Sequence, residues 1–270
     1  MTLSRSELPA DYYDHWQSEP YARCMEKYGW RVVGGTQRYG FVRRMGPFLY
    51  AKYLYTDEAP RIEEVRERTK RHGMISWTPW RRMDMPSPWR PLSSPFFPHD
   101  WRSGFARVRQ EYQTAWSQRA RRNLRKCISS GIQMRQGTVE EYCNSFRKGL
   151  IPHSLKGLVI QKIQRLPKEN LVSFLAQGHT GVIGGLCVFR YDHLSSHISS
   201  SLTQEGKESN VGTGCIDAWV RWALDEKIKY LNFGGVWTDK DPKEWQGFSE
   251  FKRNFIDYEV AFNDAYYRFF

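Results

Sequence analysis

The sequence lacks several features that would mark a membrane, secreted or zinc-binding protein. No apolar run reaches the roughly 18 residues of a transmembrane helix, and residues 1–20 show neither an apolar signal segment nor a cleavage pattern. The five cysteines are odd in number and form no Cys-x-x-Cys pair, a usage typical of reduced thiols in a reducing compartment. We therefore expect a cytoplasmic protein without a membrane span.

Metal-ligand clusters and covalent nucleophile motifs are also missing. His193 and His197 are four residues apart, but on a strand this spacing leaves them well separated on one face. No third metal ligand lies at a suitable distance along the sequence. No cysteine or serine lies in a recognisable nucleophile motif. We expect neither a metal site nor a Ser or Cys triad.

What the chain does have is a large supply of core residues and an excess of positive charge. Hydrophobic residues make up 40% of the 270 positions and aromatic residues 15%, which is ample for one large or two ordinary domains. The formal net charge of +12 attracts polyanions such as RNA, nucleotides or anionic lipid intermediates. Residues 1–112 hold 19 basic and 13 acidic side chains, and residues 113–270 hold 22 and 16, so the excess is shared equally.

The densest basic run lies on one expected helix. Its apolar stripe is Trp116, Ala120, Leu124, Cys127 and Ile128. Its basic residues are Arg119, Arg121, Arg122, Arg125 and Lys126. These five are either a solvated helix face or an anion-binding face, and the pattern alone favours neither.

Hydrophobic periodicity predicts a mixed α/β chain. The N-terminal half is expected to hold helices at 12–28 and 62–71 and strands at 30–33, 39–44, 48–55 and 74–77. A stretch rich in proline and tryptophan, residues 76–101, reads as a packed loop. After a boundary near residue 112, the C-terminal half is expected to hold a helix at 139–148 with a Thr138/Glu141 capping box, and strands at 132–135, 171–177, 182–191, 197–202, 230–236 and 260–269.

A second amphipathic helix opens at Gly212-Thr213-Gly214. Ile216, Trp219, Val220, Ala223 and Leu224 fall on one face, which predicts packing against a sheet. Asp217, Arg221, Asp225 and Lys227 are expected to face water. The strand that follows ends in Asn232-Phe233-Gly234-Gly235, where two residues without side chains let a substrate pass close to the backbone.

This order of antiparallel strands, glycine turn, helix, strand, helix and strand resembles the GNAT acyltransferase fold. A GNAT pyrophosphate loop reads Gln/Arg-x-x-Gly-x-Gly/Ala, and its backbone N–H groups hold phosphates at a helix N-terminus. Gly212 and Gly214 fit that pattern, but Ser209 stands in the Gln/Arg place. The departure argues against coenzyme A as the acyl donor.

A set of motifs more closely resembles the Fem family of aminoacyl-tRNA-dependent aminoacyltransferases, which has two GNAT-like domains. The motifs span most of the chain and occur in the family's order: Trp16-Gln17-Ser18 with Tyr21-Ala22, Arg44-Met45-Gly46-Pro47-Phe48, Arg122-Asn123-Leu124-Arg125-Lys126-Cys127 with Gly131-Ile132, Asn232-Phe233-Gly234-Gly235, and Gly247-Phe248 with Phe251-Lys252 and Phe255. The resemblance implies an α/β (α+β) fold of two GNAT-like domains, residues 1–112 and 113–270, with mixed, mostly antiparallel sheets flanked by helices. The long helical-hairpin insertion of some family members has no counterpart here.

The resemblance also implies roles for particular residues. Lys252, expected at an exposed position on the last helix, would supply positive charge to the reaction's oxyanion or to the terminal ribose of the tRNA. The implied substrate-binding residues are Arg44, Lys156, Asn232, Gly234, Gly235 and Phe251. The five basic residues of 119–126 would bind tRNA. The proton acceptor stays open among Asp239, Asp241, Glu250 and a group of the substrate.

The expected function is transfer of an amino acid from aminoacyl-tRNA to an amine of a peptidoglycan precursor or small metabolite, forming a peptide bond. An aminoacyl ester is already activated, so the enzyme needs no nucleophile and, with tRNA as co-substrate, no cofactor. One alternative is an acyl-CoA-dependent N-acyltransferase. Another is a non-catalytic RNA-binding module. We expect the protein to act as a monomer.

Overall fold

The computed structural model describes residues 2–3, 11–56, 58–66, 72–79, 87–92, 102–151, 153–179, 181–239, 241, 243–262 and 265–270. The chain forms two compact units, each assembled from separate segments. Unit 1 contains residues 1–103, 235–249 and 258–270, and unit 2 contains residues 104–234 and 250–257. This division differs from one cut after residue 112, because two C-terminal segments belong to unit 1.

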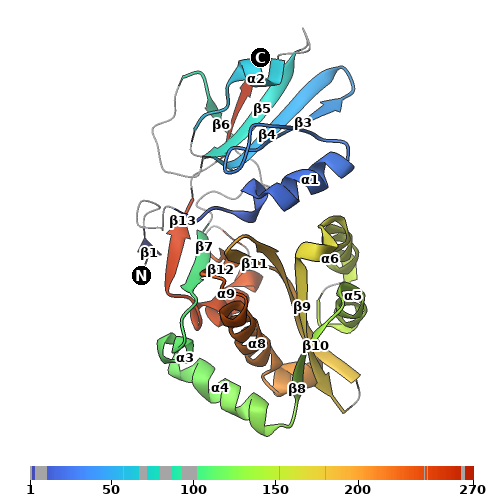
Figure 1. The fold of residues 1–270 in the computed structure, drawn as a ribbon, viewed down its shortest axis with the longest axis vertical. Helices are drawn as coiled ribbons and strands as arrows, with labels where there is room; N and C mark the ends of the chain where they lie inside the picture. Colours follow the sequence, from blue (N-terminus) through green and yellow to red (C-terminus); the bar gives the residue numbers. More distant parts are fainter. Residues whose placement is uncertain are drawn as a thin grey trace. The chain divides into compact units, whose positions relative to one another are not determined.

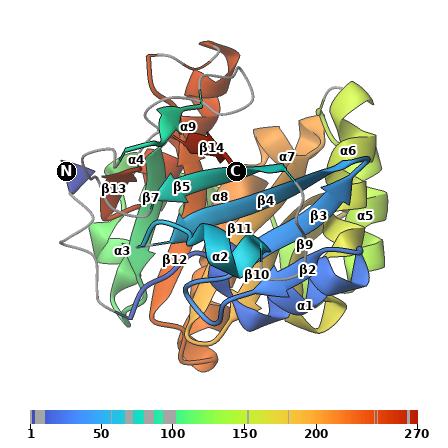
Figure 2. The same ribbon diagram turned by 90° about the horizontal axis from the view of Figure 1, so that it is seen from above.

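Unit 1 is built on a six-stranded sheet in the order β2-β3-β4-β5-β14-β6. The strands are β2 (Arg31–Val33), β3 (Gly40–Met45), β4 (Phe48–Thr56), β5 (Gly73–Pro79), β6 (Arg90–Pro91) and β14 (Tyr266–Phe269). Figure 2 shows β3, β4 and β5 side by side, and β4 pairs with β5 in parallel. The short helix α2 (Ile62–Arg66) contributes Ile62 and Val65 to the core on one face, where Trp77 and Trp89 pack with ring centroids 5.3 Å apart.

The opening motif of unit 1 has a structural role. Ser18 caps helix α1 (Glu19–Lys27), which follows the 3-10 turn η2 (His15–Gln17). Gln17 is fully buried, and its amide donates to the carbonyls of Tyr39 and Leu54 while accepting from the Tyr39 N–H. Gln17 therefore links the segment before α1 to the sheet through buried hydrogen bonds, and Ser18 stabilises the start of the helix.

Unit 2 has a sheet in the order β7-β12-β11-β10-β9-β8. Its strands are β7 (Arg102–Arg107), β8 (Gln133–Gly137), β9 (Leu171–Gly178), β10 (Gly181–Tyr191), β11 (Leu194–Leu202) and β12 (Tyr230–Val236). Strands β8 to β11 pair antiparallel, as alternation and turn residues predict, whereas β11 and β12 are parallel. Figure 1 shows helices on both sides of this sheet, with α5 (Val139–Lys148) and α6 (His153–Arg165) on one side and α8 (Val211–Asp225) on the other.

The remaining described elements are short or lie beside these. They are α3 (Tyr112–Ala115), α4 (Gln118–Ser129), η3 (Lys168–Asn170), α7 (Gln204–Glu208), η4 (Lys243–Trp245), α9 (Gln246–Arg253), β1 (Thr2–Leu3) and β13 (Tyr258–Ala261). The last two pair in parallel within unit 1. The single strand expected at 260–269 is therefore wrong, because β13 and β14 join different sheets. No helix among the described residues is long and apolar enough to cross a membrane.

The predicted fold class is confirmed: both sheets are mixed and flanked by helices. The Thr138/Glu141 capping box is present with both of its hydrogen bonds. Two helix-face predictions are wrong. Ile128 is 66% exposed, because α4 ends one residue later and its last turn passes the edge of the core. Asp217 is buried, because Tyr112 and Gln113 of α3 donate hydrogen bonds to its carboxylate.

Candidate functional site

The candidate site of unit 2 lies where two parallel strands separate. Strands β11 and β12 are paired only from Leu194/Tyr230 to Ser196/Asn232, although both continue beyond that point. Residues after the last pair are no longer paired with the other of these two strands. His197 is the first such residue on β11, and Gly234 follows two residues after the last pair on β12.

Gly234 has a conformation that suits glycine. Its φ is +70°, and its N–H donates a 2.7 Å hydrogen bond to the side-chain oxygen of buried Asn232. The turn therefore needs both residues: Asn232 as the acceptor, and a residue without Cβ in the left-handed region. A Cβ built on Gly234 would meet only one atom nearby, the Lys252 Nζ at 3.9 Å. The strand end thus presents bare backbone next to an ammonium group.

Lys252 is buried, contrary to the exposed position expected from sequence. It has 5% of its surface accessible and lies on α9 next to Phe251, which packs against the core of unit 2. Burial lowers the pKa of the Lys252 ammonium to about 7, since removal from water disfavours the charged form. At neutral pH this side chain can therefore hold or release a proton.

His197 is a site residue that sequence reasoning did not assign. It lies beside a β-bulge, since Val188 pairs with His197 and Cys187 pairs with Ser199. Burial, together with the positive charges of Lys252 and Lys162, lowers the pKa of the His197 imidazole well below its usual range. The imidazole is therefore neutral and can take part in hydrogen bonds, but the same surroundings make it a weak proton acceptor. Spacing could not reveal this environment, because it depends on the register of β11 against two neighbours.

The glycines that start α8 do not form an open phosphate loop. A Cβ on Gly214 would lie 2.4 Å from Met134 and 2.8 Å from the sulfur of Cys127, and one on Gly212 would lie 3.2 Å from the ring of Phe251. Both glycines therefore permit close packing of α8 against neighbouring elements. Close packing thus accounts for both glycines without a bound phosphate.

The other predicted substrate-binding residues differ in their surroundings. Phe251 packs against Phe255, with ring centroids 5.0 Å apart, next to Lys252. Lys156 donates a 2.7 Å hydrogen bond to the Arg147 carbonyl in the α5–α6 region. Arg44 lies in unit 1 and donates to the Gly46 carbonyl of its own hairpin. Gly235, assigned to unit 1, follows Gly234 directly in β12.

The three candidate proton acceptors are not equivalent. Asp241 accepts hydrogen bonds from both the N–H and the hydroxyl of Thr238, which makes its carboxylate part of a turn. Asp239 and Glu250 are exposed.

The basic residues of α4 lie on its exposed face, opposite buried Ala120, Leu124 and Cys127. Within this set, Arg121 donates a hydrogen bond to the Thr114 carbonyl. The exposed residues are Arg119, Arg121, Arg122, Arg125 and Lys126. They form a cationic face on one helix, as the sequence pattern predicts.

Comparison with solved structures places this geometry in a known fold. A crystal structure of FemX superposes with a TM-score of 0.75 at 10% identity, covering 99% of this chain and 96% of FemX. The fold is similar to that of FemX. The C-terminal domain of a lysylphosphatidylglycerol synthetase from Agrobacterium fabrum gives a TM-score of 0.57 at 8% identity, covering 93% and 87% of the two chains.

A third similar structure is L-PGS from Bacillus licheniformis, with a TM-score of 0.52 at 9% identity and coverage of 88% and 84%. No protein-family profile and no curated protein sequence matches this chain. The resemblance to the Fem family is thus confirmed at the level of fold. At these identities it does not extend to individual residues.

Proposed function

We propose that the protein is an aminoacyltransferase that moves an amino acid from aminoacyl-tRNA to an amine of a peptidoglycan precursor or small metabolite. The observation that carries the proposal is the placement of buried Lys252 beside the bare backbone of Gly234, at the end of a strand that has separated from its neighbour. The similarity of the fold to FemX and to lysylphosphatidylglycerol synthetase domains supports it.

The proposed reaction forms one bond and breaks one. The acceptor amine attacks the ester carbonyl, the new C–N bond forms, and the C–O bond to the terminal ribose breaks. In its protonated state Lys252 stabilises the developing oxyanion and supplies a proton to the leaving ribose oxygen. After giving up that proton, the neutral Lys252 amine takes up the proton that the acceptor amine loses, so that the net products are an amide and a free ribose hydroxyl.

Binding of tRNA increases the fraction of Lys252 side chains that carry a proton. A polyanion near Lys252 favours the charged form of the side chain and raises the pKa from about 7. The ammonium is then present when the ester is bound. The exposed basic face of α4 supplies a surface to which tRNA phosphates can bind.

Coenzyme A as donor is a weaker candidate. Its pyrophosphate would need free backbone N–H groups at a glycine turn, and the Cβ positions of Gly212 and Gly214 are occupied by neighbouring side chains. A non-catalytic RNA-binding module is favoured only by the α4 face, and it leaves the burial of Lys252 without a role.

Product analysis separates these functions. The protein is incubated with mixed charged tRNA and candidate amine acceptors, or with acetyl-CoA and the same acceptors, and new amides are measured by mass spectrometry. We expect amide only with charged tRNA, and none with Lys252→Met. Acetylated product alone would show a coenzyme A enzyme, and tRNA binding without any amide would show an RNA-binding module.

A further inference from the structure

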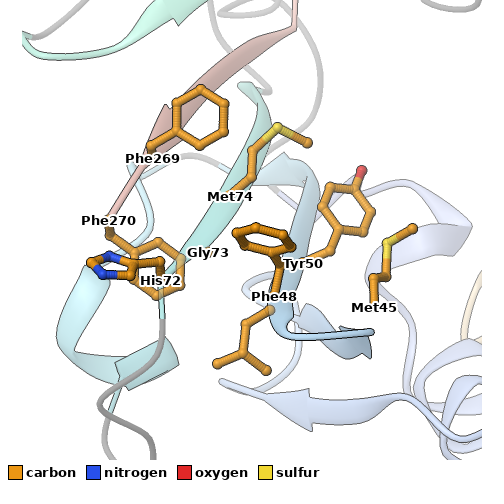
Figure 3. A pocket seen from close by; sticks show the side chains of 9 residues that line it. Met45, Phe48, Tyr50, His72, Gly73, Met74, Phe269 and Phe270 are labelled. Carbon is orange, nitrogen blue, oxygen red and sulfur yellow. The ribbon is translucent and has the colours of Figure 1, made fainter.

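One face of the unit 1 sheet has an apolar floor that the described residues of this unit leave open at one end. Register places Arg43, Tyr50, Met74 and Phe269 in a row across β3, β4, β5 and β14. Side chains opposite each other in register share a face of the sheet, so this row forms a continuous surface. A pocket of about 610 Å³ opens over it, and Figure 3 shows Phe48, Met74 and Phe269 around the pocket.

The same face is covered farther along the strands. Tyr21 of α1 packs on Phe41 with ring centroids 5.5 Å apart, and the Lys52 ammonium lies 4.8 Å from the centre of the Trp30 ring. The rings of Trp30 and Tyr50 pack edge to face, with centroids 6.1 Å apart. Beyond Tyr50 the described residues leave large apolar side chains accessible: Met45 is 60% exposed, Phe48 58% and Phe269 67%.

The exposed end of this face, which we call the apolar tip, includes the turn of a hairpin. Met45 and Phe48 are a cross-strand pair that closes the β3–β4 hairpin around Gly46, whose φ is +60°. Phe269 lies two strands away on the same face. Three accessible side chains of this size on one sheet end exceed the scattered apolar residues of an ordinary surface and indicate a binding face.

The strands of this sheet carry basic charge on both faces. The six strands of the sheet carry six basic residues and no aspartate or glutamate. By register Arg43, Lys52 and Arg90 share the face of the floor, and Arg31, Arg44 and Arg268 belong to the opposite face. Arg43 and Arg44 directly precede Met45 and are exposed, so the apolar tip has a cationic border. An apolar tip with a cationic border complements an anionic lipid surface, whose headgroups attract arginine while its acyl boundary accepts phenylalanine and methionine.

We propose that this end of unit 1, defined by Met45, Phe48 and Phe269 with Arg43 and Arg44, is a docking face for an anionic membrane. Met45, Phe48 and Phe269 insert at the acyl boundary, and the two arginines lie among the headgroups. Binding is peripheral and reversible, since the inserted area is small. The inference does not depend on the proposed reaction, because it uses no residue of the unit 2 site.

Vesicle sedimentation tests the docking face. Wild-type protein is mixed with phosphatidylcholine vesicles, with or without phosphatidylglycerol, and bound and free protein are separated. We expect binding to the anionic vesicles only, weakening as salt rises. Phe48→Ser combined with Phe269→Ser should lower the partition coefficient at least about tenfold. The matched control is Leu158→Ser on α6, whose side chain is 64% exposed, and it should leave binding unchanged.

A probe placed at the tip gives a second measurement. All five native cysteines are buried, so Phe48→Cys can be labelled selectively with a polarity-sensitive fluorophore. We expect a blue shift on adding anionic vesicles, and none with the label at Leu158→Cys. Absence of vesicle binding by wild type, or equal loss in Leu158→Ser, would overturn the proposal. So would a concentration-dependent dimer that the Phe48/Phe269 variant disrupts, or a loss confined to RNA affinity.

Discussion

Helices α4 and α9 both carry basic side chains, but Lys252 of α9 is removed from water whereas the basic residues of α4 are not. The five cations of α4 are exposed. Lys252 is 5% exposed, and burial lowers its pKa to about 7. A cation in water keeps its charge and interacts weakly at any one position, whereas a cation removed from water has a charge that its surroundings control. The comparison predicts a binding role for α4 and a chemical role for Lys252.

The largest expected effect tests the chemical role directly. Lys252→Ala should lower the single-turnover rate with charged tRNA by about a hundredfold or more, equivalent to about 3 kcal/mol of lost transition-state stabilisation. Lys252→Arg should recover part of the rate, and Lys252→Met should not. The control is Arg253→Ala, which removes an exposed cation from the same helix. A wild-type rate in Lys252→Ala would mean that Lys252 is not catalytic.

The next effect is on stability and depends on pH. The folded pKa of Lys252, about 7, lies below the unfolded value of about 10.5, so the unfolded chain binds more protons between these values. Burial of Lys252 therefore costs stability fully below pH 7, and the cost disappears as pH rises toward 10.5. Lys252→Met should raise the free energy of unfolding by about 2–3 kcal/mol at pH 7 and by under about 1 kcal/mol at pH 10.

Urea denaturation at the two pH values measures this difference. Arg253→Met, at the exposed neighbouring position, should change stability by less than about 0.5 kcal/mol at either pH. An equal gain for Lys252→Met at pH 7 and pH 10 would show that the gain comes from packing and not from the lysine charge.

Asp217 and Asp225 of α8 provide the same comparison of a buried and an exposed group, here with negative charge. Asp217 accepts hydrogen bonds from Tyr112 and Gln113 and pairs with Arg221 at 2.9 Å, while Asp225 is exposed two turns later. Asp217→Ala should cost about 2 kcal/mol, because Tyr112 and Gln113 lose their acceptor. Asp225→Ala should cost less than about 0.5 kcal/mol. Thermal denaturation of the two variants compares them, and similar losses would contradict the effect of burial.

The smallest effect concerns the exposed cations. Arg121→Gln combined with Arg122→Gln should weaken tRNA binding by about tenfold and reduce the slope of log affinity against log salt by about one to two. Stability should change by less than about 0.5 kcal/mol. The control removes two exposed cations from α1, Arg23→Gln with Lys27→Gln. Unchanged affinity and slope in the α4 variant would restore the interpretation of a solvated face.

Much of the fold was predictable because its signals are local. The capping box of α5, the alternation of β9 to β11 and the breaks at glycine each depend on residues close in sequence. The errors share a cause: Asp217 is buried by a helix about a hundred residues earlier, and the C-terminal strand divides between two sheets. The candidate site was predictable in part, since the motif identified Lys252, Asn232 and Gly234 but not their environment.

The sequence by itself determined many of the helices and strands, the mixed α/β class and the position of one lysine after a Gly-Gly strand end. Only the tertiary structure decided that Lys252 is buried, that β11 and β12 separate beside it, and that His197 lies where its imidazole stays neutral. Hydrophobic periodicity depends only on the residues within one helix or strand. Burial and pKa depend on elements distant in the chain, and their packing is not encoded in any single segment.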